Sequence, residues 1–176
     1  MVGQTGFEPA TPSPPDWCAT KLRYCPRFSK EGIKPSFGVP PFDVKATLYA
    51  DGGSRGNPGP AASGAVLFAE DGEVLEEIGT FLGVTTNNVA EWTALLQGLK
   101  AALARGIDDI DVRLDSELVV RQLSGAYRVK HPGLIPLHAE AKSLLRKFAH
   151  HDVRHVRRKE NAAADAVVNQ VLDAHR

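Results

Sequence analysis

Residues 46–68 read ATLYADGGSRGNPGPAASGAVLF, and this stretch decides the fold. The alternating pattern predicts one strand over 46–51 and a second over 61–69, joined by a glycine- and proline-rich connection. Tyr49 and Asp51 would point to the same face of the first strand. No helix begins at that strand end, so no helix dipole would stabilise a carboxylate there. Asp51 is therefore a candidate functional residue.

The composition of the 176-residue chain suits one packed domain. Hydrophobic residues make up 43% and charged residues 24%, which is enough apolar material for a core. The 21 Lys and Arg balance the 21 Asp and Glu, so no overall basic field marks a nucleic-acid-binding protein. Any such binding must come from local arrangement. No apolar run reaches the roughly 18 to 20 residues that span a membrane, and no secretory signal pattern is present. We expect a soluble, cytoplasmic protein with no membrane partner.

Residues 1–45 differ from the rest of the chain. They contain eight of the 12 prolines, and proline disfavours helices and central strands. Both cysteines lie there too, but the spacing of Cys18 and Cys25, with no nearby His, argues against a zinc site or a cytosolic disulfide. We expect a mostly disordered tail. The letters GFEP at 6–9 can be encoded by codons resembling the T-arm of a transfer-RNA gene, so the assigned start is predicted to lie too far upstream. The predicted ordered domain is 46–176.

After the first two strands the chain continues as an α/β pattern. Asp71-Gly72 is a hairpin signal that leads into a third strand over 73–83. A helix is predicted over 87–106, ending at a glycine. The remaining prediction is a strand over 109–116, a short helix over 117–125, a helix over 137–149, a strand over 152–158 and a helix over 161–175. Three strands followed by strands alternating with helices predict a mixed sheet with helices packed on it.

Four acidic residues from four predicted elements could converge. Asp51 and Asp115 end strands, which is where α/β proteins bind ligands. Glu91 lies one turn into its helix, and Asp165 lies in the first turns of the last one. Like charges about 4 Å apart repel by roughly 1 to 4 kcal/mol in partly screened surroundings, so such a cluster indicates a metal site or a catalytic role. Hard oxygen ligands favour Mg²⁺ or Mn²⁺.

Three of these acids also have a purely structural interpretation. Asn88-x-x-Glu91 fits a capping box in which Asn88 caps the helix. Asp115 and Asp165 could each simply favour the dipole of a helix. Only convergence of all four would separate the functional interpretation from these.

Four sequence blocks resemble the motifs of the ribonuclease H type 1 family, in the same order and at similar spacing. They are YADGGSRGNPGPAASG at 49–64, TTNNVAEWTALLQGLKAAL at 85–103, VRLDSELVVRQLSG at 112–125 and VRRKENAAADAVVNQ at 156–170. The resemblance covers about 46–174. It implies the ribonuclease H-like α/β fold: a five-stranded mixed sheet, three antiparallel strands and then two parallel ones, flanked by helices.

The resemblance also implies an activity, namely endonucleolytic hydrolysis of the RNA strand of RNA/DNA hybrids. Asp51, Glu91, Asp115 and Asp165 match the family's catalytic, metal-binding carboxylates, with Asp51 bridging two Mg²⁺ or Mn²⁺ ions. Two such ions roughly 3.5 to 4 Å apart activate water, stabilise the charged phosphate and assist the leaving 3′ oxygen. No obligatory protein partner is implied.

Substrate contacts are predicted at a further set of residues. Family positions that touch the RNA 2′-hydroxyl match the turn and the start of the following helix, although the glycines could simply permit a sharp turn. Scattered cations would grip the phosphates, although each alone is more often solvated surface. The predicted substrate-binding residues are Gly52, Gly53, Ser54, Arg55, Asn57, Asn87, Asn88, Arg157 and Arg158.

The sequence departs from the best-known type 1 enzymes in two ways. The loop before Asp165 reads RRKEN and lacks their His, with Glu160 as the candidate replacement. The long basic insertion that grips substrate is also absent, because only ten residues separate Leu123 from Leu134. Two alternatives stay open: a catalytically idle hybrid-binding module, or another nuclease on the same fold. The intact carboxylates argue against the first, and the lack of a D-x-E pattern at Asp51 argues against exonuclease relatives.

Overall fold

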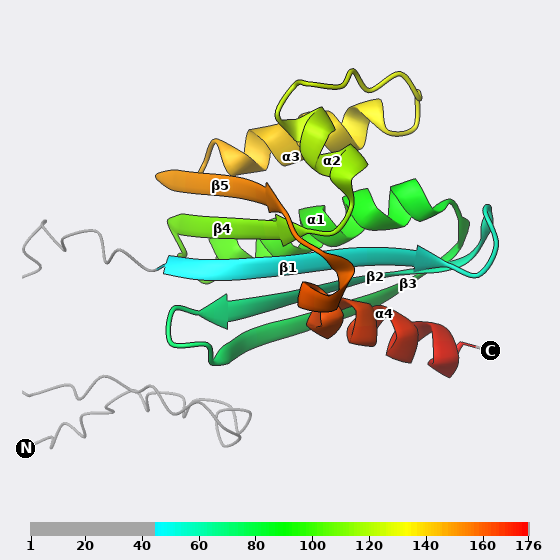
Figure 1. Cartoon of the computed structure of the whole chain (residues 1–176), viewed down its shortest axis with the longest axis horizontal. Coiled ribbons are helices and arrows are strands. Elements are labelled where there is room, and N and C mark those ends of the chain that lie inside the picture. The colour runs from blue at the N-terminus through cyan, green and yellow to red at the C-terminus, as the bar shows by residue number, and fades with distance from the viewer. Residues whose placement is uncertain (1–44, 176) are drawn as a thin grey trace, which may run out of the picture. The chain divides into compact units, whose positions relative to one another are not determined.

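The computed structural model describes residues 45–175, so the predictions made for 1–44 concern residues outside this range. Five strands form one mixed sheet in the order β3-β2-β1-β4-β5 (Figure 1). The first three strands are antiparallel, while β4 pairs parallel to β1 and β5 parallel to β4. The predicted topology is confirmed. The strands are β1 (Lys45–Ser54), β2 (Gly59–Ala69), β3 (Val74–Thr85), β4 (Asp109–Leu114) and β5 (His150–His155).

Four α-helices and a short 3₁₀ helix accompany the sheet over the described range. Figure 1 shows α4 on one face of the sheet, with α1 behind the opposite face. None of the helices between residues 45 and 175 is both long and apolar enough to cross a membrane. The helices are α1 (Asn87–Ala104), α2 (Glu117–Leu123), α3 (Ile135–Leu145), α4 (Ala162–Ala174) and the 3₁₀ helix η2 (Arg158–Glu160).

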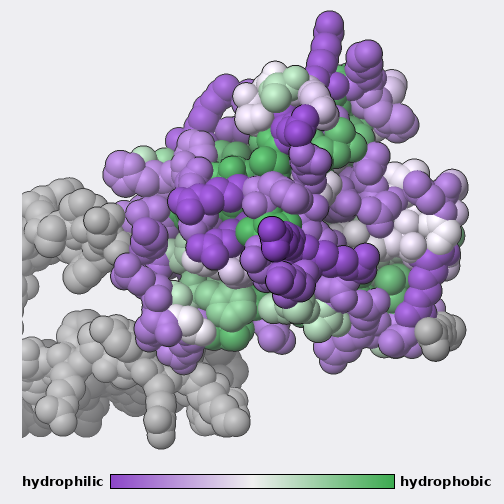
Figure 2. Space-filling model, in the orientation of Figure 1, coloured by the Kyte–Doolittle hydropathy of each residue, from purple (hydrophilic) through white to green (hydrophobic). Residues whose placement is uncertain are grey.

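Side chains alternate along β1 as the sequence predicts. Ala46 and Leu48 are fully buried in the main core beneath α1, whereas Tyr49 and Asp51 belong to the opposite face. On that face, which carries α4, hydrophilic residues predominate at the surface (Figure 2). The sheet therefore has one face that packs into the main core and one face with a smaller hydrophobic cluster beneath α4 and a polar surface around it.

A row of glycines lets α4 approach the sheet. Gly64 on β2 is paired with Asp51 on β1, and Gly79 on β3 is paired with Gly64. A Cβ atom at Gly64 would lie 2.7 Å from the carbonyl oxygen of Ala164, closer than real Cβ contacts allow. A Cβ atom at Gly79 would lie 2.7 Å from the side chain of Val171. The missing side chains thus set the distance at which α4 rests beside Asp51.

The element boundaries correct several predictions. Thr86, not Asn88, caps α1, because its side chain accepts a hydrogen bond from the backbone N–H of Val89. The capping-box interpretation of Asn88 and Glu91 is therefore wrong. Helix α3 begins before the predicted residue 137, since Pro136 lies in its first turn, where a missing N–H is tolerated. Strand β5 begins and ends earlier than predicted.

Candidate active site

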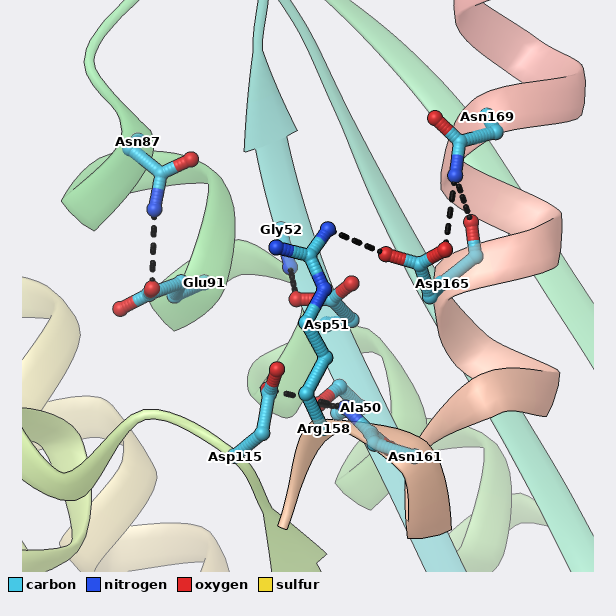
Figure 3. A network of polar contacts seen from close by, with 10 residues as sticks. All are labelled: Ala50, Asp51, Gly52, Asn87, Glu91, Asp115, Arg158, Asn161, Asp165 and Asn169. Carbon is cyan, nitrogen blue, oxygen red and sulfur yellow. Dashed lines mark hydrogen bonds and ion pairs between the residues drawn. The ribbon is translucent and has the colours of Figure 1, made fainter.

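The four predicted carboxylates converge on one cleft of about 340 Å³. Asp51 comes from β1, Glu91 from α1, Asp115 from the residue after β4, and Asp165 from the first turn of α4 (Figure 3). Two parallel strands bring Asp51 and Asp115 to the same edge of the sheet. The cleft is also lined by Gly52, Gly53, Ser54, Arg55, Asn87, Arg158, Val168, Asn169 and Leu172.

Gly52 brings β1 and α1 into backbone contact at the cleft. A Cβ atom at this position would lie 2.1 Å from the backbone nitrogen of Glu91 and 2.2 Å from the carbonyl carbon of Ala90. Any other residue would therefore push the helix away from the strand. The same glycine donates its backbone N–H to Oδ1 of Asp51 at 2.8 Å. Gly52 thus fixes both the position of Glu91 and the orientation of Asp51.

The carboxylates lie close enough to perturb one another. Burial raises the pKa of Asp51 from its ordinary 3.8 to about 7, with further contributions from the charges of Asp115, Asp165 and Glu91. The hydrogen bond from Gly52 acts in the opposite direction. Burial also raises the pKa of Glu91, although hydrogen bonds partly offset the effect. The hydrogen bond from Gly52 therefore stabilises the ionised form of Asp51 less than burial and the neighbouring carboxylates destabilise it.

Neutral donors hold Glu91 in place. The Ser116 hydroxyl donates to Oε2 of Glu91 at 2.6 Å, and the side chain of Asn87 donates to Oε1 at 2.9 Å. Asn87 was predicted as a substrate contact, whereas Ser116 was not singled out from the sequence. Its position directly after a strand-ending Asp could have suggested a role at the same edge of the sheet.

A buried asparagine holds Asp115. Asn161 is fully buried, and its Nδ2 donates to Oδ1 of Asp115 at 2.9 Å and to the carbonyl oxygen of Ala50 at 3.1 Å (Figure 3). It thereby ties the start of α4 to both β1 and the end of β4. Sequence reasoning missed Asn161, because an Asn before a helix is expected as a cap, yet this one makes no side-chain cap bond.

Both carboxylate oxygens of Asp165 accept hydrogen bonds from neighbouring side chains. Its Oδ1 accepts a hydrogen bond from Arg158 at 2.8 Å, and its Oδ2 accepts one from the side chain of Asn169 at 2.8 Å. Asn169 lies one turn further along α4 and also donates to the carbonyl oxygen of Asp165. Asn169 likewise was not predicted.

The predicted substrate contacts divide into two groups. Gly52, Gly53, Ser54, Arg55, Asn87 and Arg158 line the cleft, whereas Asn57, Asn88 and Arg157 do not. The side chain of Arg55 is engaged at the end of α4, where it donates to the carbonyl oxygen of Leu172 and forms an ion pair with Asp173. Asn57 accepts a hydrogen bond from the backbone N–H of Asn87 at 3.2 Å.

Glu160, the candidate replacement for the missing loop His, does not line the cleft. Its carboxylate accepts a hydrogen bond from the backbone N–H of Arg157 at 3.1 Å, and it lines a different hollow with Tyr49 and Phe68. His155 on β5 contacts the backbone beside the cleft, because its Nε2 lies 3.2 Å from the carbonyl oxygen of Asp115.

The donor set fits a hard divalent cation. Carboxylate oxygens are the preferred ligands of Mg²⁺ and Mn²⁺, and the raised pKa of Asp51 reflects negative charge that a cation would compensate. Between residues 45 and 175, however, no three His, Cys, Asp or Glu side chains are grouped closely enough to hold a metal as they stand. Side chains of the cleft must therefore shift for a cation to bind.

Comparison with known proteins agrees with this geometry. Residues 49–171 match the family model described as reverse transcriptase-like. The chain is 47% identical over 125 residues to "Ribonuclease HI" of Halobacterium salinarum, covering 71% of this chain and 63% of that protein. It is 44% identical over 132 residues to a bifunctional protein of Mycobacterium tuberculosis but spans only 36% of that protein's length.

Solved structures extend the comparison. The crystal structure of ribonuclease H1 from Halobacterium salinarum has a TM-score of 0.72 and 45% identity, covering 74% of this chain and 98% of that one. LC11 ribonuclease H1, solved in complex with an RNA/DNA hybrid, has a TM-score of 0.70 and 40% identity, covering 74% and 98%. The family model, the sequence identities and the shared topology show that the chain belongs to the reverse transcriptase-like family, among its ribonuclease H type 1 members.

Proposed function

We propose that this protein is a metal-dependent endonuclease that hydrolyses the RNA strand of RNA/DNA hybrids. The observation that carries the proposal is the convergence of Asp51, Glu91, Asp115 and Asp165 in one cleft. Burial and the charges of the neighbouring carboxylates, which together raise the pKa of Asp51, bring the fold no structural benefit. The likeness to a ribonuclease H1 solved with a hybrid supports the choice of substrate.

In this proposal the four carboxylates hold Mg²⁺ or Mn²⁺. When bound, two such ions would activate the attacking water, stabilise charge on the phosphate and assist the leaving 3′ oxygen. The chain itself supplies fixed geometry. Gly52 sets the spacing of Asp51 and Glu91, Ser116 orients Glu91, and Asn161 orients Asp115.

Substrate selection is assigned to the rim of the cleft beside Asp51. The backbone of Gly52, Gly53 and Ser54, with the side chain of Asn87, lines the cleft next to Glu91. Backbone and amide groups can both donate and accept hydrogen bonds, which is what recognition of an RNA 2′-hydroxyl requires. We further assign Arg55, Asn57, Asn88, Arg157 and Arg158 to contacts with the hybrid around this rim.

Cleavage of a labelled hybrid tests the proposal. The full chain is incubated with RNA/DNA hybrid, with the matching DNA duplex, and with single-stranded RNA, each in Mg²⁺, Mn²⁺ or EDTA. We expect internal cuts in the RNA of the hybrid only, requiring metal and leaving 3′-hydroxyl ends. Ca²⁺ should support binding but not turnover, because it accepts a looser and larger ligand shell than Mg²⁺.

Asp51→Asn provides the decisive variant. It keeps the size of the side chain and the contact with the Gly52 N–H while removing one metal-binding charge. Cleavage should fall by orders of magnitude while hybrid binding survives. Near-normal cleavage by Asp51→Asn would contradict the metal assignment. An unmodified protein that binds hybrid without ever cutting it would instead favour the binding-module alternative.

A further inference from the structure

Arg158 lines the acidic cleft, although most of its side chain is exposed to solvent. It begins η2, just before α4, and its Nη2 donates to Oδ1 of Asp165 at 2.8 Å. In the view of Figure 3 its guanidinium group overlaps Asp51, and a dashed line joins it to the carboxylate of Asp165. The hydrogen bond that Arg158 donates to Asp165 raises its pKa, and the negative charges of Asp165, Asp51 and Asp115 act in the same direction. Arg158 therefore forms an ion pair with Asp165 and also interacts electrostatically with Asp51 and Asp115.

Arg158 is the cleft's main internal source of positive charge. Of the described residues that line the cleft, only Arg55 and Arg158 are basic. Arg55 is engaged with Asp173 and the carbonyl oxygen of Leu172, at the far end of α4. Arg158 is thus the lining cation whose ion pair involves one of the four acids.

Arg158 competes with a metal for one carboxylate oxygen of Asp165. One oxygen of Asp165 accepts from Arg158 and the other accepts from Asn169. Asn169 lies on the same helix as Asp165, so its hydrogen bond can persist when the carboxylate moves. Arg158 lies outside that helix, and 80% of its side chain is exposed. An exposed ion pair of this kind is weak and easily exchanged. Arg158 is therefore the partner that can leave.

We propose that Arg158 is a displaceable counter-ion: it neutralises the carboxylates while the site lacks metal, and a divalent cation must release its guanidinium from Asp165 to bind. This inference rests on the proposed assignment of the four carboxylates as metal ligands. Because the same contact stabilises the metal-free form and competes with the metal, removing it should have opposite effects on the two forms. The metal-free fold should lose stability, and metal should bind more tightly.

Metal titration without substrate separates this role from a purely structural or substrate-binding one. The full chain is titrated with Mn²⁺ by isothermal calorimetry, and free Mn²⁺ is followed by electron paramagnetic resonance. The variants are Arg158→Gln and Arg158→Ala. We expect both to bind Mn²⁺ about two- to fivefold more tightly than the unmodified chain, which is the range that an exposed ion pair supports.

A matched control is Arg154→Gln. Arg154 also forms an exposed ion pair, but its partner is Asp152 on β5, outside the cleft. This variant should leave Mn²⁺ affinity unchanged. In EDTA, Arg158→Gln should unfold at a slightly lower temperature, by about 1 to 4 °C, and the rise in unfolding temperature on adding Mn²⁺ should be larger than in the unmodified chain.

The outcomes distinguish this inference from the proposed function. If Asp51→Asn leaves Mn²⁺ affinity unchanged, the cleft does not hold the metal, and both proposals fail. If Asp51→Asn weakens Mn²⁺ binding while both Arg158 variants bind it as the unmodified chain does, or less tightly, the metal site stands and only the counter-ion inference is overturned.

Discussion

The raised pKa of Asp51 makes the stability of the metal-free protein depend on pH. Burial and the neighbouring carboxylates raise the pKa of this carboxyl from 3.8 to about 7, so the folded state favours its protonated form. The stability contributed by that form is fully present below pH 4 and is lost as the pH rises through about 7. Between pH 5 and pH 8 the loss amounts to about 1.5 to 3 kcal/mol.

Asp51→Asn should remove this loss, because an amide does not ionise. In EDTA, the free energy of unfolding of Asp51→Asn minus that of the unmodified chain should therefore be about 1.5 to 3 kcal/mol more positive at pH 8 than at pH 5. Urea titrations at both pH values measure this difference, followed by circular dichroism and by tryptophan fluorescence, to which the fully buried Trp92 contributes.

Asp152→Asn serves as the control for this experiment. Its hydrogen bond from Arg154 lowers the pKa of Asp152, so this variant should gain nothing on going to pH 8. Saturating Mg²⁺ should stabilise the unmodified chain at pH 8 and narrow the gap to Asp51→Asn. An equal effect of Asp51→Asn at both pH values, or destabilisation at pH 8, would refute the reasoning from a buried, mutually repelling cluster.

Further changes test the packing, the buried contacts and the tail. Gly64→Ala should displace α4 and lower both stability, by about 1 to 3 kcal/mol, and hybrid cleavage; thermal unfolding and cleavage rates measure these, and an unchanged protein would contradict the close approach. Asn161→Ala should destabilise the fold by about 1 to 3 kcal/mol in urea, because buried acceptors lose their donor, and should weaken Mn²⁺ binding through Asp115. Arg157→Ala should flatten the dependence of hybrid affinity on salt, and an unchanged slope would show that this side chain does not contact the hybrid. A chain lacking residues 1–43 should keep its cleavage rate and unfolding temperature, since the described core clusters lie within the remaining sequence; a large drop would show that this segment is docked.

Much of the site could be predicted because strand ends and helix starts follow from local pattern. The alternation through Asp51 indicates which face its side chain takes, and Asp71-Gly72 forms the expected turn, with Gly72 at φ 87°. Asp115 follows directly from the end of its strand. These features depend on neighbouring residues along the chain, which the sequence displays.

Other features depend on which elements meet, and only the tertiary structure decided them. The cap of α1 is Thr86 rather than Asn88, although both residue types can cap a helix. Asn161 binds Asp115 across 46 positions of sequence, and its role exists only because α4 starts where β1 and β4 end. Of two adjacent arginines, Arg158 reaches Asp165 whereas Arg157 does not line the cleft. The sequence alone determined which side chains were available and on which elements. The close approach of helices to the sheet, made possible by glycines without side chains, determined which of them touch.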